Sequence, residues 1–195
     1  MVTQEERRAA TKAAILKAAR AIFGDQGFGA ATIDQIAAAA GVAKGAVYHH
    51  FPTKEAVFEA VFELASRELV AEVISASVGA PDALTGMAAG TRAYFAACSR
   101  GPMARIILRD GSAVLGWERW RKIDEHHFGG MIPIALAAAM DEGAIPRQPV
   151  EPLGRLLLGA VTEAAMACAA SDDVARAAAD YGRAVEALLE ALRAR

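Results

Sequence analysis

The chain has 195 residues, 54% of them hydrophobic, and a formal net charge of −2 at pH 7. This length suits one large domain or a small domain joined to a larger one. The small net charge argues against a protein that binds nucleic acid over most of its surface. No charge-free apolar run of about 18 residues occurs, and the charged N-terminus has no secretory apolar core. We therefore expect a cytoplasmic protein that makes no membrane contact.

The N-terminal third reads as three helices. Apolar residues between Ile15 and Phe23 recur at helical spacing, and the helix is expected to end near the glycines of "GDQGFG". Thr32 is a good N-cap for a short second helix, which Gly41 should break. A third short helix is expected from about Ala43 to His49. Two short helices around a tight glycine turn predict a helix-turn-helix.

The stretch "TIDQIAAAAGVAKGAVYHHFPTKEAVF" resembles the DNA-binding signature of tetracycline-repressor-like (TetR family) regulators. The likeness covers roughly residues 10–60 and follows a first helix of the expected length. It implies that the matched positions contact double-stranded DNA. These positions are Thr32, Lys44, Gly45, Tyr48, His50 and Lys54.

The chemistry of the same stretch also favours DNA. Gly45 permits close approach to the sugar-phosphate wall, and Lys44 can reach a base edge or a phosphate. Tyr48, with His49 or His50, can donate hydrogen bonds to phosphate oxygens. The ammonium of Lys54 and the amides that open its helix could hold one phosphate between them. Ala43 stands where a Ser or Thr cap is common, which removes one capping hydrogen bond.

The rest of the chain also reads as helical, without the period-2 alternation of strands. Helices are expected from Lys54 to about Val78, from Pro81 to about Ser99, at residues 104–108, from Ala113 to Glu142 with a bend, from Pro152 to about Ala170, and after Ser171. The fold class is therefore all-α, with about nine helices. We divide the chain into a DNA-binding domain, 1–54, and a larger domain for ligand binding and dimerisation, 55–195. Residues 1–55 carry seven basic and five acidic side chains, whereas residues 56–195 carry fourteen and eighteen, which agrees with this division.

Reading a palindrome requires two-fold symmetry, so a homodimer is expected. The last two helices carry apolar stripes that could pair with a second copy, as the corresponding helices do in the family, or could face the core of their own subunit. The expected interface residues are Leu153, Leu157, Ala160, Ala164, Tyr181, Val185, Leu188 and Leu192.

The segment "GWERWRKIDEHHFGGM" gathers two tryptophans, two histidines and several charges. Trp117, Trp120, Asp124, His127 and Met131 recur at helical spacing and should share a face. This face either lines a pocket for a partly apolar small molecule or forms a core stripe in which Asp124 and His127 pair. The resemblance adds residues from helices that line the ligand cavity in the family, namely Phe62, Phe95, Cys98 and Met166.

No motif predicts an enzyme or a cofactor. The "DEHH" run lacks the spacing of a zinc protease, and neither a nucleophile elbow nor a phosphate-binding glycine loop occurs. His49 and His50 point about 100° apart on a helix, which argues against a shared metal ion. The sequence thus predicts a DNA-binding regulator, and the resemblance implies that it acts as a repressor. The alternative is a helical ligand-binding or protein-interaction module whose DNA head is inactive.

Overall fold

The computed structural model describes residues 3–194, which form helices joined by short turns, with no strand in that range. This confirms the all-α prediction. The elements are α1 (Gln4–Ala30), α2 (Ile33–Ala40), α3 (Lys44–His50), α4 (Lys54–Ser77), α5 (Ala83–Cys98), α6 (Gly101–Met103), the π-helix η1 (Ala104–Asp110), α7 (Gly111–Leu115), α8 (Trp117–Phe128), α9 (Met131–Asp141), α10 (Val150–Ala170) and α11 (Val174–Glu190). With α6–η1–α7 taken as one irregular segment and α8–α9 as one bent helix, the described residues give the nine helices expected.

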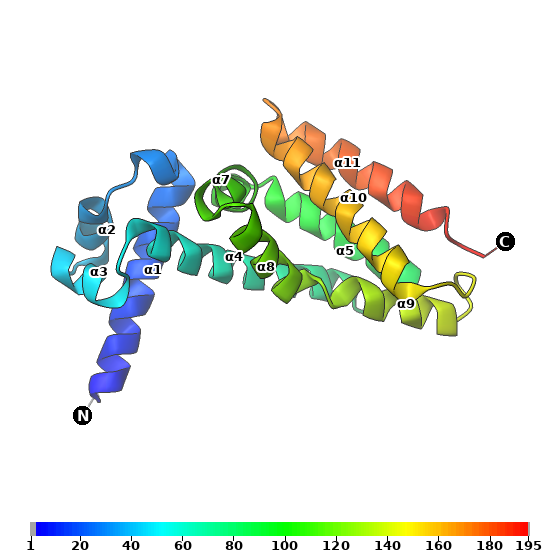
Figure 1. The fold of residues 1–195 in the computed structure, drawn as a ribbon, viewed down its shortest axis with the longest axis horizontal. Helices are drawn as coiled ribbons and strands as arrows, with labels where there is room; N and C mark the ends of the chain where they lie inside the picture. Colours follow the sequence, from blue (N-terminus) through cyan, green and yellow to red (C-terminus); the bar gives the residue numbers. More distant parts are fainter. Residues whose placement is uncertain (1–2, 195) are drawn as a thin grey trace.

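Helices α1, α2 and α3 form a small head on the first turns of α4 (Figure 1). Thr32 caps α2 through a reciprocal pair of hydrogen bonds with Gln35, and Gly41 ends it with φ of 68°. Both features agree with the sequence prediction. Helix α1 instead continues past Phe23 to Ala30, and the glycines produce a break inside it at Gly27, where φ is 81°.

Aromatic side chains fasten the head to α4. Phe23 and Phe28 of α1 both pack edge-on against Phe58, with ring centroids 5.3 and 5.4 Å apart. Val47 and Phe51 complete this core and are almost fully buried. The head and the first half of α4 therefore form one packed unit.

The larger part of the molecule is a bundle in which α5 packs between α4 and α11, while α10 packs against α9 and α11 (Figure 1). Helix α4 belongs to the core of both the head and the bundle. The proposed domain boundary after residue 54 remains a prediction, since α4 starts at Lys54 and serves both parts.

A second connection between head and bundle runs through η1. The backbone N–H of Phe28 donates a 2.8 Å hydrogen bond to the carboxylate of Asp110, and the Arg105 guanidinium donates to the carbonyl of Asp25. The prediction for residues 113–142 was wrong at its start, because Gly116 adopts φ of 74° and α8 begins only at Trp117.

Candidate nucleic-acid interface and ligand pocket

Helix α3 separates an apolar side from a polar side. Val47 is fully buried in the head, whereas Lys44, Gly45, Tyr48 and His49 are exposed. Tyr48 has 47% of its surface accessible, which is unusual for a large aromatic side chain and leaves its hydroxyl available. The structure thus brings four of the predicted DNA-contact residues together on one open helix face.

Lys44 lies at the start of this face, and its ammonium is 2.9 Å from the carboxylate of Asp34 on α2. This hydrogen bond and the charge of Asp34 raise the pKa of Lys44. Both side chains are more than half exposed, so the pair is weak in water and can open toward a phosphate. Thr32 is exposed beside them, with its hydroxyl accepting from Gln35 N as the cap of α2.

The ammonium of Lys54, which was predicted to hold a phosphate, is engaged in hydrogen bonds within the head. The ammonium donates to the carbonyl oxygens of Phe28, at 2.8 Å, and Ala31, at 3.0 Å. It also lies 4.2 Å from the centroid of the Phe28 ring. The Lys54 ammonium thus uses two of its three N–H groups at the connection between α1 and α2.

His50 is partly buried at the end of α3. Burial, followed by the nearby His49, Arg8 and Lys12, lowers the pKa of His50 below its ordinary value, which favours the neutral ring in the free protein. Ala43, as predicted, makes no capping hydrogen bond to α3.

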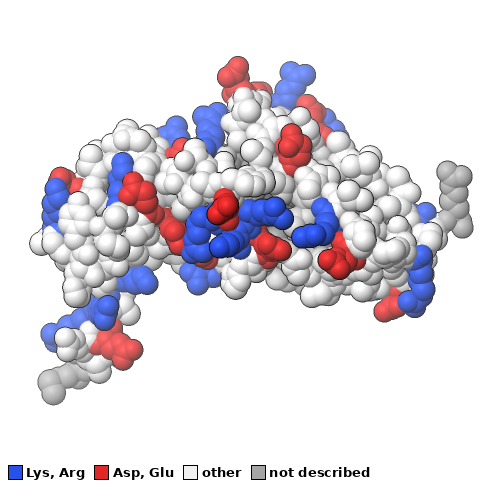
Figure 2. Space-filling view, viewed as in Figure 1, with Lys and Arg blue, Asp and Glu red and all other residues white. Residues whose placement is uncertain are grey.

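Basic side chains continue from the head onto α1. Arg7, Arg8 and Lys12 are all exposed on the part of α1 that projects from the body. Figure 2 shows both blue and red side chains on this projection, as over the rest of the visible face. Their exposure is compatible with two interpretations: an arm that enters the minor groove of DNA, or a helix face in contact with solvent only.

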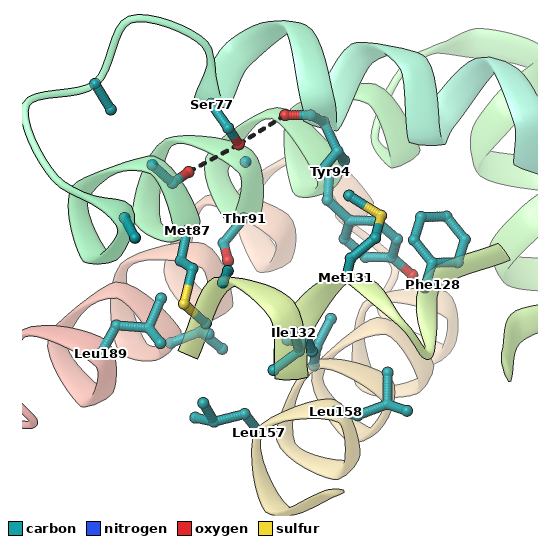
Figure 3. Close-up of a pocket in the computed structure, with 18 of the residues that line it drawn as sticks. Ser77, Met87, Thr91, Tyr94, Phe128, Met131, Ile132, Leu157, Leu158 and Leu189 are labelled. Atoms are coloured by element: carbon teal, nitrogen blue, oxygen red, sulfur yellow. Dashed lines mark hydrogen bonds between the residues drawn. The ribbon is translucent and has the colours of Figure 1, made fainter. Parts of the chain in front are cut away.

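A cavity of about 390 Å³ lies between α4, α5, α9, α10 and α11, with α8 closing one side. Its wall is mostly apolar and aromatic, including Met87, Tyr94, Phe128, Met131, Ile132 and Leu157. Figure 3 shows these side chains converging on the cavity from α5, α8, α9 and α10. The volume and the lining are typical of a small-molecule site.

The predicted ligand residues divide into three groups. Asp124 lines this cavity, and it also lines a neighbouring cavity of about 500 Å³ together with Trp117, Trp120 and Met166. Phe62, Phe95 and Cys98 are not among the cavity residues, because their side chains are buried in the core of the bundle. His127 pairs with Glu63 of α4 at 2.7 Å, rather than with Asp124 or a cavity.

Most residues that form the wall of the first cavity were not predicted from the sequence. Tyr94 directly precedes Phe95, which was predicted, and the two side chains point to different sides of α5: Phe95 into the core and Tyr94 to the cavity. Met131 belongs to the predicted stripe, whereas Phe128, directly after His127, was not predicted, and its apolar character was the available signal. The choice between adjacent faces of α5 could not be made without its packing partners.

The predicted dimer stripes are only partly exposed. Leu157, Ala164 and Val185 are buried within their own chain, and Leu153, Ala160 and Leu192 are half-buried. Tyr181 and Leu188 are exposed at 40% and 53%, and Leu156, which was not in the predicted set, is exposed at 72%. The stripes therefore contain an inner row that faces the bundle and an outer row that faces solvent.

Helix α10 is also the one described helix that is long and apolar enough to cross a membrane by length and composition. Only 28% of its most apolar stretch is buried within the chain. A core helix of a larger assembly has the same composition, so this property is weak evidence for a membrane. It does show that α10 leaves much apolar surface uncovered.

Comparison with known families decides the class of the protein. The family described as "Bacterial regulatory proteins, tetR family" matches residues 15–61, and the "Tetracyclin repressor-like, C-terminal domain" matches residues 84–192, more than half of the chain. The chain belongs to the tetR family. This confirms the resemblance found in the sequence and the prediction of a DNA-binding transcription regulator that is not an enzyme.

Individual relatives agree with this membership. The HTH-type transcriptional repressor Rv1474c of Mycobacterium tuberculosis is 31% identical over 121 residues, which cover 58% of this chain and 59% of that protein. The HTH-type transcriptional regulator SrpR of Pseudomonas putida is 52% identical over 58 residues, 30% of this chain and 26% of its own length. The alignments thus span about three fifths of the first relative and a quarter of the second.

Solved structures match over nearly the whole chain. A TetR-family transcriptional regulator from Pectobacterium atrosepticum superposes with a TM-score of 0.88 at 28% identity, covering 99% of this chain and 98% of that one. RolR in complex with the ligand resorcinol has a TM-score of 0.71 at 18% identity, with 98% and 97% coverage. The second likeness shows the fold alone.

Proposed function

We propose that this tetR-family protein acts as a cytoplasmic homodimer that binds a palindromic operator and represses transcription until a small molecule releases it. The observation that carries the proposal is the exposed polar face of α3, where Lys44, Gly45 and Tyr48 stand opposite the buried Val47. A short helix with this division suits insertion into a major groove, with its inner face fixed by the head. Repressor action is supported by the name of the mycobacterial relative.

The dimer is supported by the outer faces of α10 and α11. These helices pack side by side at the surface of the bundle (Figure 1), and they expose Leu156, Met166, Tyr181 and Leu188. Exposed apolar side chains of this size are typical of a protein–protein interface. Pairing through this face with two-fold symmetry could set two α3 helices about 34–36 Å apart, as successive major grooves require.

Ligand control is supported by the position of the apolar cavity. Its wall includes Val73 and Ser77 at the end of α4, whose first turn is tied to the head by Lys54 and Phe58. A ligand that favours one placement of α4 would change the spacing of the two heads by a shift in populations. The resorcinol complex of RolR shows that another protein of this fold holds a small organic ligand.

The proposal is tested by selection from a pool of randomised duplex DNA, comparing the native protein with a Lys44→Ala, Tyr48→Ala double variant. Both substituted side chains are exposed, so the variant should keep the native melting temperature. Recovery of a palindrome by the native protein alone supports the proposal. If the native protein enriches no motif at any salt concentration, the DNA head is inactive, and the protein functions as a ligand-binding or protein-interaction module.

A further inference from the structure

The charged residues that line the 390 Å³ cavity are all acidic. Asp82, Asp124 and Glu142 contribute carboxyl groups, and no lysine, arginine or histidine belongs to the wall formed by the described residues. A carboxylate or phosphate on a ligand would find no counter-charge there and would lose its hydration on entry. The wall therefore disfavours anionic ligands.

Two of these three carboxyl groups already have partners. Asp82 caps α5 by accepting from Thr85 N at 2.7 Å, and the Arg193 guanidinium lies 3.0 Å from its other oxygen. Glu142 accepts from the backbone N–H of Ala83 at 2.7 Å. Both carboxylates therefore serve to fix the first turn of α5 and the C-terminal end of the chain.

Asp124 differs from these two residues. Within residues 3–194 its carboxyl group receives no hydrogen bond and forms no ion pair. His127 on the same helix turns to Glu63, while Arg121 and Arg155 line the neighbouring cavity without pairing with Asp124. A half-buried carboxyl group without a partner is costly when ionised. In agreement, burial raises the pKa of Asp124 to about 6, with His127 opposing and Glu125 adding to this change.

Aromatic rings lie on the same side of the cavity as Asp124. Phe128 is one turn further along α8, and its ring packs edge-on against Tyr94 with centroids 5.8 Å apart. Figure 3 shows Tyr94, Phe128 and Met131 together at one side of the cavity, and Met87 and Leu189 at the other. Ring faces beside a carboxylate attract organic cations, whose spread charge is easily removed from water.

We propose that this cavity selects an apolar organic cation, a tertiary or quaternary amine, whose charge lies against Asp124 and the rings of Tyr94 and Phe128. The proposal rests on the proposed function in one respect, because it takes the cavity as the effector site. The apolar body of the ligand would occupy the space between Met87, Ile132 and Leu157. Binding would supply the counter-charge that Asp124 lacks among residues 3–194.

Calorimetric titration of the full-length protein without DNA, at about pH 7.5, tests the proposal. The probes are (4-phenylbutyl)trimethylammonium, its uncharged isostere with carbon in place of nitrogen, and 5-phenylpentanoate. We expect the native protein to bind the cation at least about tenfold more tightly than the isostere and to bind the anion weakest. Asp124→Asn should abolish the preference for the cation. Glu118→Gln, which removes an exposed charge from the same helix, should keep it.

Three results would overturn the proposal: no binding of the cation up to about 1 mM, equal binding of cation and isostere by the native protein, or an undiminished preference in Asp124→Asn. A melting temperature of Asp124→Asn no lower than that of the native protein shows that the variant is folded. Release of operator DNA is measured separately. If the cation binds selectively but does not release DNA, the proposed ligand class holds and ligand control fails. If only an uncharged or anionic compound releases DNA, ligand control holds and the proposed ligand class is wrong.

Discussion

The Lys54 ammonium lies 4.2 Å from the centroid of the Phe28 ring and donates a 2.8 Å hydrogen bond to the carbonyl oxygen of the same residue. A second hydrogen bond, 3.0 Å long, reaches the carbonyl of Ala31. These contacts join the first residue of α4 to the turn that leads from α1 into the helix-turn-helix. Lys54 thus fixes the orientation of the DNA-reading helices on the helix that borders the cavity.

Replacing this lysine should affect stability more than DNA electrostatics. Lys54→Met keeps the aliphatic stem but removes two charge-assisted hydrogen bonds, so we expect a loss of about 1–3 kcal/mol in the free energy of unfolding. The slope of log affinity for DNA against log salt should stay within error of the native value. Lys17→Met, at an exposed site on α1, serves as the stability control. A fall of about one in the salt slope of Lys54→Met would instead show that Lys54 contacts a phosphate.

Lys44 and Asp34 form a pair whose members should act oppositely on DNA. Lys44→Ala is expected to weaken operator binding and to reduce the salt slope by about one, since one released counterion is lost. Asp34→Asn should strengthen binding, because it removes a negative charge next to the phosphates and frees Lys44 from its 2.9 Å pair. Fluorescence anisotropy at several salt concentrations measures both. Weaker binding by Asp34→Asn would place this pair away from the DNA.

Leu188 lies on the outer row of α11 with 53% of its surface exposed, so a charge there is tolerated by the single chain. We expect Leu188→Glu to convert a dimer into a folded monomer and to remove operator binding at concentrations where the native protein is dimeric. Val78→Glu, at an even more exposed apolar residue after α4, should remain dimeric. Sedimentation velocity distinguishes these states, and an unchanged dimer of Leu188→Glu would exclude this face as the interface.

Asp124 should make stability depend on pH in a definite direction. Its pKa is raised from an ordinary value of 3.8 to about 6, chiefly by burial, so the folded state binds the proton more tightly than the unfolded state. The destabilising contribution is then absent below about pH 4, grows as the pH rises to about 6, and is complete above that, at no more than about 3 kcal/mol. Asp124→Asn should be more stable than the native protein at pH 7.5 and lose this gain at pH 4. Chemical denaturation at the two pH values measures the effect, and equal gains at both would contradict it.

Local features of the head were predictable because short-range chemistry determines them. Thr32 followed by Gln35 at N3 specifies a capping box, and Gly41 specifies the left-handed residue of the turn, whatever else the chain contains. The exposed DNA-contact residues of α3 could likewise be predicted from the residue spacing within this short stretch. Lys54 was different: its partners, the carbonyls of Phe28 and Ala31, lie 26 and 23 residues away in the chain, and no pattern indicated them.

In the bundle, periodicity identified the helices but not the face that each side chain occupies. The stripe on α11 contains two rows: Ala178 and Val185 face the bundle, and Tyr181 and Leu188 face solvent. On α8 the predicted stripe divides among the cavities, the core and a hydrogen bond with α4, since Trp120 is buried while His127 contacts Glu63. An amphipathic pattern gives the width of an apolar face, and packing partners decide how that face is shared.

The most direct test of the account is an equilibrium titration of the selected palindromic duplex against the same duplex with one half-site scrambled. The native protein should bind the palindrome with two chains per duplex and lose at least about tenfold in affinity when one half-site is scrambled. The Lys44→Ala, Tyr48→Ala variant should bind both duplexes equally weakly. Equal affinity of the native protein for the two duplexes, or one chain per palindrome, would contradict a dimer that reads DNA through two α3 faces.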